Sequence, residues 1–425
     1  MWRLLYTALL WVALPVVRLR LWWRGRREPG YREAIAERFG ASSLQVRPQL
    51  LWVHAVSVGE ARACAPLVRA LQREYPDHEL LVTCLTAAGR ETVKQVYGDS
   101  VRCAWLPYDY PHALRRFLGH YRPRLGVLVE TEVWPNLVHV CAQYGVPLVL
   151  ANARMSEKSA RGYRTVAGLS RPAFAALGAV CAQSEADAGR IRELGARKVS
   201  VTGNLKFDIE PDIARSEAGR AWRAALPHER VLLLASTREG EEAQLLDALG
   251  TQDDGTLVVL VPRHPQRFNE VAALAQRMGF AAARRSLGEA PRAGVRLYLG
   301  DTMGEMAFYY ATADVAVIGG SIEPLGGQNL IEACAAGVPV VAGPHMFNFA
   351  EATRLAVEAQ AALQVADAAG AIAAARSLLV DAERCARMGE AGRLLCAAHR
   401  GAAERHLAVC RALLAPQPPR ARGRG

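Results

Sequence analysis

Two successive series of short apolar segments, alternating with longer helix-like segments, constrain the fold of this chain more than any other sequence feature. The first series begins at residue 50 and the second near residue 230. Strands buried on both faces of a parallel sheet appear as continuous apolar runs, and their alternation with helices is typical of doubly wound α/β domains. The pattern therefore predicts two Rossmann-like domains. The expected strands are Leu50–Val56, Glu79–Leu85, Leu125–Val129, Val146–Leu150, Ala179–Ala182, Val199–Val201, Arg230–Ala235, Thr256–Val261, Arg296–Leu299, Val315–Ile318 and Val338–Ala342.

The 425 residues are enough for two domains with large cores. We expect residues 41–205 to form the N-terminal domain and residues 206–400 the C-terminal domain, joined near the polar stretch 203–212. Residues 401–425 should contain the end of a last helix and a disordered tail rich in Pro, Arg and Gly. Ligands of such domains bind at the carboxyl ends of the strands, which would line a cleft between the two domains.

Residues 1–40 are expected to form a membrane anchor with a basic flank. Fourteen residues without a charge, Leu4–Val17, include Pro15 and are followed by Trp22, Trp23 and many arginines. Residues 1–40 hold eight arginines and three glutamates, and no small-x-small cleavage site follows the apolar run. Positive charge beside an apolar segment marks the cytoplasmic side. The segment either spans the membrane or lies in its interface; the alternative is a buried first helix.

Charge, cysteine spacing and motifs exclude several classes of protein. Most of the net charge of +11 lies at the two chain ends, whereas a nucleic-acid-binding domain more often carries a basic stripe on a folded face. Nine scattered cysteines without a C-x-x-C motif indicate reduced thiols in a cytosolic compartment, without zinc or disulfides. The sequence has no P-loop, G-x-G-x-x-G, H-E-x-x-H or G-x-S-x-G motif, which disfavours kinases, dehydrogenases, zinc hydrolases and α/β-hydrolases.

Acidic residues follow two strands of the first series. The segment His54-Ala-Val-Ser-Val-Gly-Glu60 places a glutamate in the first turn of a helix. An acid there complements the helix dipole or acts as a general base. Glu130 and Glu132 come after Leu125–Val129. If strand geometry continues beyond this run, their side chains point to opposite sides, so only one of them faces the expected cleft.

Four strand ends of the second series predict a nucleotide site. Arg263, His264 and Arg267 follow one strand, and cations at a strand end suit a phosphate. Glycine-containing turns follow two more strands and precede helices, an arrangement that lets backbone amides approach a phosphate. These segments are Ser236–Glu242, Val261–Phe268, Gly300–Met306 and Gly319–Ser321 with Gly326–Glu332.

These blocks, with Glu130-Thr-Glu-Val-Trp-Pro-Asn136, Gly203-Asn-Leu-Lys206, Gly343-Pro-His345 and Phe347-Asn-Phe349, resemble the 3-deoxy-D-manno-octulosonic acid (Kdo) transferases of lipopolysaccharide assembly. The resemblance implies a GT-B fold, in which two Rossmann-like domains face each other across a cleft, with an N-terminal membrane anchor helix. It implies an enzyme at the cytoplasmic face of the inner membrane that moves Kdo from CMP-Kdo to the lipid A precursor, lipid IVA. It implies neither a metal nor a cofactor apart from the donor substrate, and no nucleic-acid partner.

The resemblance also assigns roles by position. Glu60 matches the general base, and Glu130 and Lys206 match residues that stabilise the transition state. The positions that match CMP-binding segments are Arg263, His264, Met303, Gly304, Glu305, Asn329, Leu330, Ile331 and Glu332. The sequence departs from the family where Arg238 replaces a usual His, and where Gln328-Asn329-Leu330 replaces His-Asn-Pro. Gln328 cannot become cationic near neutral pH, and Arg238 adds a permanent charge.

The resemblance implies a one-step displacement that inverts the anomeric centre, which needs a base but no covalent nucleophile. Three other functions remain open from the sequence. They are a GT-B transferase that uses a UDP-sugar on a lipid acceptor, a sugar-nucleotide epimerase, and a non-catalytic membrane-bound relative.

Overall fold

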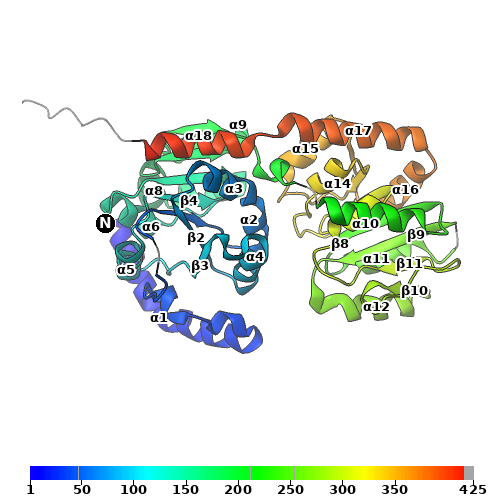
Figure 1. The fold of residues 1–425 in the computed structure, drawn as a ribbon, viewed down its shortest axis with the longest axis horizontal. Helices are drawn as coiled ribbons and strands as arrows, with labels where there is room; N and C mark the ends of the chain where they lie inside the picture. The colour runs from blue at the N-terminus through cyan, green and yellow to red at the C-terminus, as the bar shows by residue number, and fades with distance from the viewer. Residues whose placement is uncertain (46, 211, 253, 416–425) are drawn as a thin grey trace, which may run out of the picture. The chain divides into compact units, whose positions relative to one another are not determined.

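The computed structural model describes residues 1–45, 47–210, 212–252 and 254–415, which form two compact units (Figure 1). Unit 1 consists of residues 1–209 together with the C-terminal segment from Arg400, and unit 2 consists of residues 210–399. Each unit has its own seven-stranded parallel sheet. The expectation of two Rossmann-like domains is therefore confirmed.

The sheet of unit 1 has the strand order β3-β2-β1-β4-β5-β6-β7. Its strands are β1 Leu50–His54, β2 Glu79–Cys84, β3 Arg102–Trp105, β4 Leu125–Val129, β5 Leu148–Ala153, β6 Ala179–Ala182 and β7 Val199–Val201. Its helices are α1 Trp2–Arg27, α2 Val58–Ala63, α3 Ala65–Glu74, α4 Ala87–Tyr97, α5 Pro111–Tyr121, α6 Pro135–Gln143, α7 Glu157–Thr165, α8 Ala167–Ala175, α9 Glu185–Glu193 and α18 Ala402–Leu414. Short 3₁₀ turns are η1 Pro29–Arg32, η2 Ile35–Phe39, η3 Gly98–Ser100 and η4 Leu205–Asp208.

Burial on both faces explains the continuous apolar runs of unit 1. Along β1, Leu50 and Trp52 join the core on one face of the sheet, whereas Leu51 and Val53 join the core on the other face. Successive strand side chains point to opposite faces, so a strand covered by helices on both sides needs apolar residues at every position.

Unit 2 repeats the plan with the strand order β10-β11-β9-β8-β12-β13-β14. Its strands are β8 Arg230–Thr237, β9 Thr256–Pro262, β10 Ala282–Arg284, β11 Leu297–Leu299, β12 Val315–Ile318, β13 Val340–Ala342 and β14 Ala362–Gln364. Its helices are α10 Ile213–Ala224, α11 Glu241–Leu249, α12 Phe268–Arg277, α13 Met306–Thr312, α14 Ile331–Ala336, α15 Ala350–Glu358, α16 Ala368–Leu379 and α17 Ala382–His399, with 3₁₀ turns η5 Pro265–Arg267 and η6 Arg285–Leu287.

The three strands that the apolar pattern did not predict are edge strands. β3 closes one side of the first sheet, and β10 and β14 form both sides of the second sheet. Each contains positions that are exposed or only partly buried. An edge strand has a neighbour on one side only and is less completely covered, so it does not need a continuous apolar run.

The passage from unit 1 to unit 2 lies at Ile209, four residues after the expected boundary at residue 205. Leu205 is fully buried and belongs to the core of unit 1, together with Ala402 and Leu407 of α18. Helix α18 returns to unit 1 and packs beside α3 (Figure 1). Residues 402–414 thus form a core helix of unit 1; the tail expected to be disordered lies, from residue 416, outside the described residues.

Helix α1 is continuous from Trp2 to Arg27 and includes Pro15. Among the described residues it is the one helix long and apolar enough to cross a membrane by length and composition. A core helix or a signal sequence can meet the same criterion, but only 6% of its most apolar window is buried. The alternative of a fully buried first helix is therefore wrong.

Candidate active site

Glu60 lies at the start of α2, directly after β1. Ser57 caps this helix and accepts a hydrogen bond from the backbone N–H of Glu60. In return the Glu60 carboxylate accepts hydrogen bonds from the N–H of Val56, at 2.8 Å, and from the Ser57 hydroxyl, at 3.0 Å. This Ser-x-x-Glu arrangement is a variant of the capping box, and it fixes the carboxylate at the carboxyl end of β1. Each carboxylate oxygen keeps a second lone pair that can accept a proton.

Both glutamates after β4 lie close enough to influence Glu60. Glu130 has a φ of +64°, in the left-handed region, so the chain leaves strand geometry at this residue. The condition for opposite orientations of Glu130 and Glu132, a strand that continues beyond Val129, is therefore not met. Both carboxylates raise the pKa of Glu60, and Glu132 accepts a hydrogen bond from the Trp134 indole N–H at 2.8 Å.

Burial and neighbouring charge give Glu60 an unusual affinity for protons. Burial, and then repulsion from Glu130, raises the pKa of Glu60 to about 7, although its two hydrogen bonds oppose the shift. Burial also raises the pKa of Glu132, again with a contribution from Glu130. A carboxyl group with a pKa near neutrality exchanges its proton at physiological pH, as a general base requires.

Lys206 brings a positive charge to this cluster. Its ammonium lies 3.4 Å from Glu130 Oε1, and both side chains are largely buried, with 14% and 16% exposed. Asn204 accepts a hydrogen bond from the Lys206 N–H and starts the η4 turn. Three sequence-predicted residues, Glu60, Glu130 and Lys206, are therefore brought together within unit 1.

A buried amide and a buried histidine support the turn that carries Lys206. Asn152 accepts a hydrogen bond from the N–H of Leu205 at 3.0 Å. Its own N–H donates to Nε2 of His406, on α18, at 2.9 Å. Asp208 accepts from the N–H groups of Gly401 and Ala403 at the start of α18. Sequence analysis missed these residues, because their partners lie more than 50 residues away.

The nucleotide-type segments of unit 2 follow four adjacent strands, β11, β9, β8 and β12. Arg263, after β9, donates from Nε to Oε1 of Gln328 at 3.2 Å. Burial, and then the charges of Arg238 and Arg263, lowers the pKa of His264, so this imidazole is neutral near pH 7. The two positions at which the chain departs from the family, Arg238 and Gln328, thus lie beside the predicted Arg263–His264 pair.

Glu241 organises the turn after β12 and was not singled out from the sequence. Its buried carboxylate accepts hydrogen bonds from the N–H groups of Gly320, Ile322 and Arg238, at 2.5, 2.8 and 2.9 Å. A Cβ at Gly319 would overlap the carbonyl oxygen of Ser236, so this position needs glycine. Glu241, which follows β8, thus bonds to the backbone of the glycine turn that follows β12.

Hydrogen bonds and an ion pair with other residues of unit 2 hold the segment that follows β11. Arg285 forms a two-pronged ion pair with Glu305, at 2.9 and 3.2 Å, and Thr302 donates to the same carboxylate. These hydrogen bonds lower the pKa of Glu305. Met303 is exposed, and the carbonyl of Gly304 accepts a hydrogen bond from Arg215. Met303 and Gly304 therefore present an accessible turn, whereas Glu305 stabilises it.

The segment that opens α14 is arranged around Asn329. Its side-chain oxygen accepts from the N–H of Ile331, and its Nδ2 donates to Glu332 at 2.8 Å. The Tyr310 hydroxyl donates to the Asn329 carbonyl. Leu330 and Ile331 are buried, so of these four predicted residues Asn329 and Glu332 are the two with partly exposed polar side chains.

Arg267 has a different place from that expected. The sequence placed it with Arg263 and His264 in a cationic group, but its guanidinium lies 2.6 and 3.1 Å from the oxygens of the buried Glu242. It also contacts Glu270. A buried arginine paired with two carboxylates is a structural element, so Arg267 does not contribute to a phosphate site.

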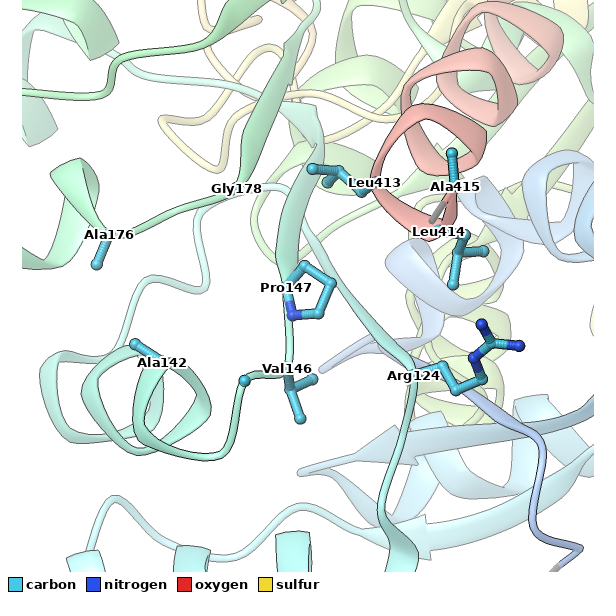
Figure 2. A pocket seen from close by; sticks show the side chains of 10 residues that line it. Arg124, Ala142, Val146, Pro147, Ala176, Gly178, Leu413, Leu414 and Ala415 are labelled. Carbon is cyan, nitrogen blue, oxygen red and sulfur yellow. The ribbon is translucent and has the colours of Figure 1, made fainter. Parts of the chain in front are cut away.

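A cavity of about 500 Å³ lies away from these residues (Figure 2). It is lined by Arg124, Val146 and Pro147, which precede β4 and β5, and by Leu413 and Leu414 of α18. These positions are at the amino ends of the strands, whereas ligands of parallel α/β sheets bind at the carboxyl ends. No cluster of three or more His, Cys, Asp or Glu that could hold a metal occurs in the part of the chain that the structure describes.

Two family models match the chain, one in each unit. A family model described as 3-deoxy-D-manno-octulosonic-acid transferase matches residues 33–209, and one described as glycosyl transferases group 1 matches residues 284–395. A 3-deoxy-D-manno-octulosonic acid transferase of Bordetella pertussis is 46% identical over 96% of this chain and 98% of its own length. A protein of the same name from Haemophilus influenzae is 37% identical over 96% and 97%.

The solved structures show a similar fold. A UDP-GlcNAc 2-epimerase from Neisseria meningitidis, bound to UDP-GlcNAc, has a TM-score of 0.59 and 15% identity over 85% of this chain and 99% of its own. At this identity the likeness concerns the fold alone. The two Rossmann-like units and the match to a glycosyltransferase family model confirm the expected GT-B class.

Proposed function

The chain belongs to the 3-deoxy-D-manno-octulosonic acid transferases, a family of glycosyltransferases, and on this basis we propose that it transfers Kdo from CMP-Kdo to the lipid A precursor, lipid IVA, at the cytoplasmic face of the inner membrane. The observation that carries the proposed mechanism is the cluster of Glu60, Glu130 and Lys206 in unit 1. Glu60 is the general base, and Glu130 and Lys206 stabilise the transition state.

Glu60 removes the proton from the attacking hydroxyl of the acceptor. The hydrogen bonds from Val56 and Ser57 fix the carboxylate, and a pKa of about 7 makes it a stronger base than an exposed glutamate while leaving it partly ionised at neutral pH. Kdo is displaced from CMP in one step, so the configuration at its anomeric carbon is inverted.

Lys206 and Glu130 act as a charge pair. Lys206 supplies a fixed cation for the carboxylate of Kdo and for the negative charge that develops in the transition state. Glu130 holds the ammonium at 3.4 Å and raises the pKa of Glu60 through repulsion. The low exposure of the pair strengthens these electrostatic interactions relative to water.

Unit 2 binds the CMP part of the donor. Departure of CMP adds about one negative charge to the phosphate, and Arg263 with the backbone amides of the glycine turns stabilises that charge. The positions proposed to bind CMP are Arg263, His264, Met303, Gly304, Glu305, Asn329, Leu330, Ile331 and Glu332. Arg238 lies beside His264 and adds a second cation there, whereas Gln328 orients Arg263 through its amide oxygen.

Localisation follows from the acceptor and from helix α1. A lipid acceptor stays in the bilayer, so the enzyme must reach the membrane surface. The apolar α1 and the arginines that follow it supply such an attachment, and arginines near an apolar segment favour the cytoplasmic side.

A transfer assay with competing nucleotides tests the proposal. Purified full-length protein is incubated with radiolabelled Kdo as CMP-Kdo and with lipid IVA, and labelled lipid is counted in the presence of CMP or UDP. We expect label in the lipid and inhibition by CMP but not by UDP. Folded protein that transfers no label from CMP-Kdo would overturn the proposal. In a parallel incubation with labelled UDP-sugars, transfer of label would then indicate a UDP-sugar transferase, and no transfer from either donor would indicate a non-catalytic relative.

A further inference from the structure

One face of helix α1 contacts the rest of unit 1, and the opposite face is exposed. Its partly or fully buried residues recur at intervals of three and four, as on one side of a helix. They are Arg3, Tyr6, Thr7, Leu10, Ala13, Leu14, Val17, Leu21 and Gly25. The contact extends over nearly the whole helix, from its first turn to its last, and involves α6, α8 and η1 (Figure 1).

Hydrogen bonds hold the first half of α1 against the rest of unit 1. Arg3 and Thr7 both donate hydrogen bonds to Oδ1 of Asn136, at 3.2 and 3.1 Å. The Tyr110 hydroxyl donates to the backbone carbonyl of Leu10 at 2.7 Å. Tyr6 hydrogen-bonds to Asp109, whose carboxylate also caps the start of α6. A helix that left unit 1 to cross a bilayer would lose all of these contacts.

Aromatic contacts extend the attachment. Trp11 lies against Tyr110 and stacks on His112, with ring centroids 5.4 and 5.0 Å apart. Near the other end of the helix, Arg18 lies over Phe39 and Arg24 over Tyr31, at 5.6 and 5.3 Å. These rings belong to the same unit as the sheet, so α1 is part of the folded surface of unit 1 along its length.

The opposite face of α1 carries an exposed apolar stripe. Its side chains are 49–79% exposed and are Leu5, Leu9, Val12, Val16, Leu19 and Trp23. At about 100° per residue they fall within an arc of roughly 80° on the helix surface. By the same geometry Arg20 and Arg26 lie just beyond the two edges of the stripe. Trp22 and Trp23 stack with Arg26 and Arg27 at 3.8 and 4.0 Å.

The charges of α1 match an anionic surface. Helix α1 contains six arginines and no acidic residue. Tryptophans beside arginines at the edge of an apolar stripe suit the level of lipid headgroups. Helix α1 as a whole is long enough to span a bilayer. Its uncharged part, between Arg3 and Arg18, rises only about 22 Å, less than the ~30 Å thickness of the hydrocarbon core.

We propose that α1 lies in the plane of the membrane surface, with the stripe from Leu5 to Trp23 immersed among anionic lipids and its other face docked on unit 1. The helix therefore attaches the protein to one leaflet without crossing the bilayer, and it fixes which side of unit 1 is turned towards the lipid. This inference rests on the proposed function only in that the acceptor is a membrane lipid.

The location of the two chain ends tests the inference. The full chain is expressed in a Gram-negative bacterium with a protease-cleavable epitope tag at either end, and intact spheroplasts are treated with the protease. An in-plane helix leaves both tags uncut until the cells are lysed. Cleavage of the N-terminal tag in intact spheroplasts, with a periplasmic control protein also cut, would show that α1 spans the membrane and would overturn the inference.

Substitutions in the stripe provide a second test. The double variant Leu9→Gln, Val16→Gln removes two apolar side chains from the stripe, and Val380→Gln, Leu394→Gln removes two equally exposed ones from unit 2. Alkaline carbonate should release several-fold more of the first variant than of the second or the wild type. Equal release would contradict the inference. Kdo transfer by the same membranes is measured separately, so failure of the topology is distinguishable from failure of the proposed function.

Discussion

Replacing Glu60 by glutamine should change both catalysis and stability, and the stability change should depend on pH. Glu60 has a pKa of about 7 in the folded protein, compared with 4.5 for an ordinary glutamate, because burial and Glu130 disfavour its charged form. Between these values the folded state binds more protons than the unfolded state. Ionised Glu60 therefore reduces the free energy of unfolding as the pH rises from about 5 through 7.

The magnitude follows from the size of the shift. A difference of about 2.5 pKa units corresponds to roughly 3 kcal/mol at pH 8, but to less than 1 kcal/mol at pH 5. Glutamine has no charge to bury but loses one acceptor for the Val56 N–H or the Ser57 hydroxyl, which costs about 1 kcal/mol at every pH. We expect Glu60→Gln to be about 2 kcal/mol more stable than the wild type at pH 8 and no more stable at pH 5.

Urea unfolding followed by tryptophan fluorescence provides the assay. Of the eight tryptophans only Trp222 lies outside unit 1, so the signal reports mainly on the unit that contains Glu60. Glu91→Gln, at a glutamate that is 60% exposed in the same unit, serves as the control and should show little change with pH. A difference between Glu60→Gln and the wild type that does not vary with pH, or that is destabilising at pH 8, would refute the reasoning.

Three further predictions concern turnover and nucleotide binding. The rate constant kcat/KM should fall about tenfold per pH unit below about pH 7, as Glu60 becomes protonated; a rate that is flat from pH 5 to 8 in a pH-rate profile would contradict this. Lys206→Met should lower kcat about 10²-fold while Lys206→Arg keeps a measurable part of it, and steady-state kinetics that give equal values for both variants would exclude a role for the cation. Arg263→Ala should weaken CMP binding about 10–100-fold in a calorimetric titration, whereas Arg387→Ala, an exposed residue on α17, should not change it.

Most of the fold could be predicted from the sequence because its strands are buried on both faces. Four expected strands, such as Leu125–Val129 and Val315–Ile318, have the bounds that the structure gives them. The edge strands β3, β10 and β14 could not be found in this way, since they are less completely covered.

The candidate site could be predicted only where its residues follow strands. Glu60, Glu130 and Arg263 were found because they stand at the carboxyl ends of β1, β4 and β9. Glu132 is close enough to raise the pKa of Glu60, and it follows a residue with left-handed backbone, Glu130. The pattern of apolar residues does not predict this backbone conformation.

The hydrogen bonds and ion pairs between distant residues around the site could not be predicted from the sequence either. The hydrogen bond from Asn152 to His406 joins residues 254 positions apart, and it places α18 in the core of unit 1 instead of at a free chain end. The ion pair of Arg267 with Glu242 likewise removes a cation that the strand-end pattern had assigned to the nucleotide site.

Mass spectrometry of the lipid product tests the central claim most directly. Purified wild-type protein and Glu60→Gln are incubated side by side with CMP-Kdo and lipid IVA at pH 8, and both are checked for folding. The wild type should add the mass of at least one Kdo residue to the lipid, and the variant should retain no more than a few per cent of this turnover, as expected for loss of a general base. An unchanged lipid mass with folded wild-type protein, or product formation by the variant at a rate near that of the wild type, would contradict the account.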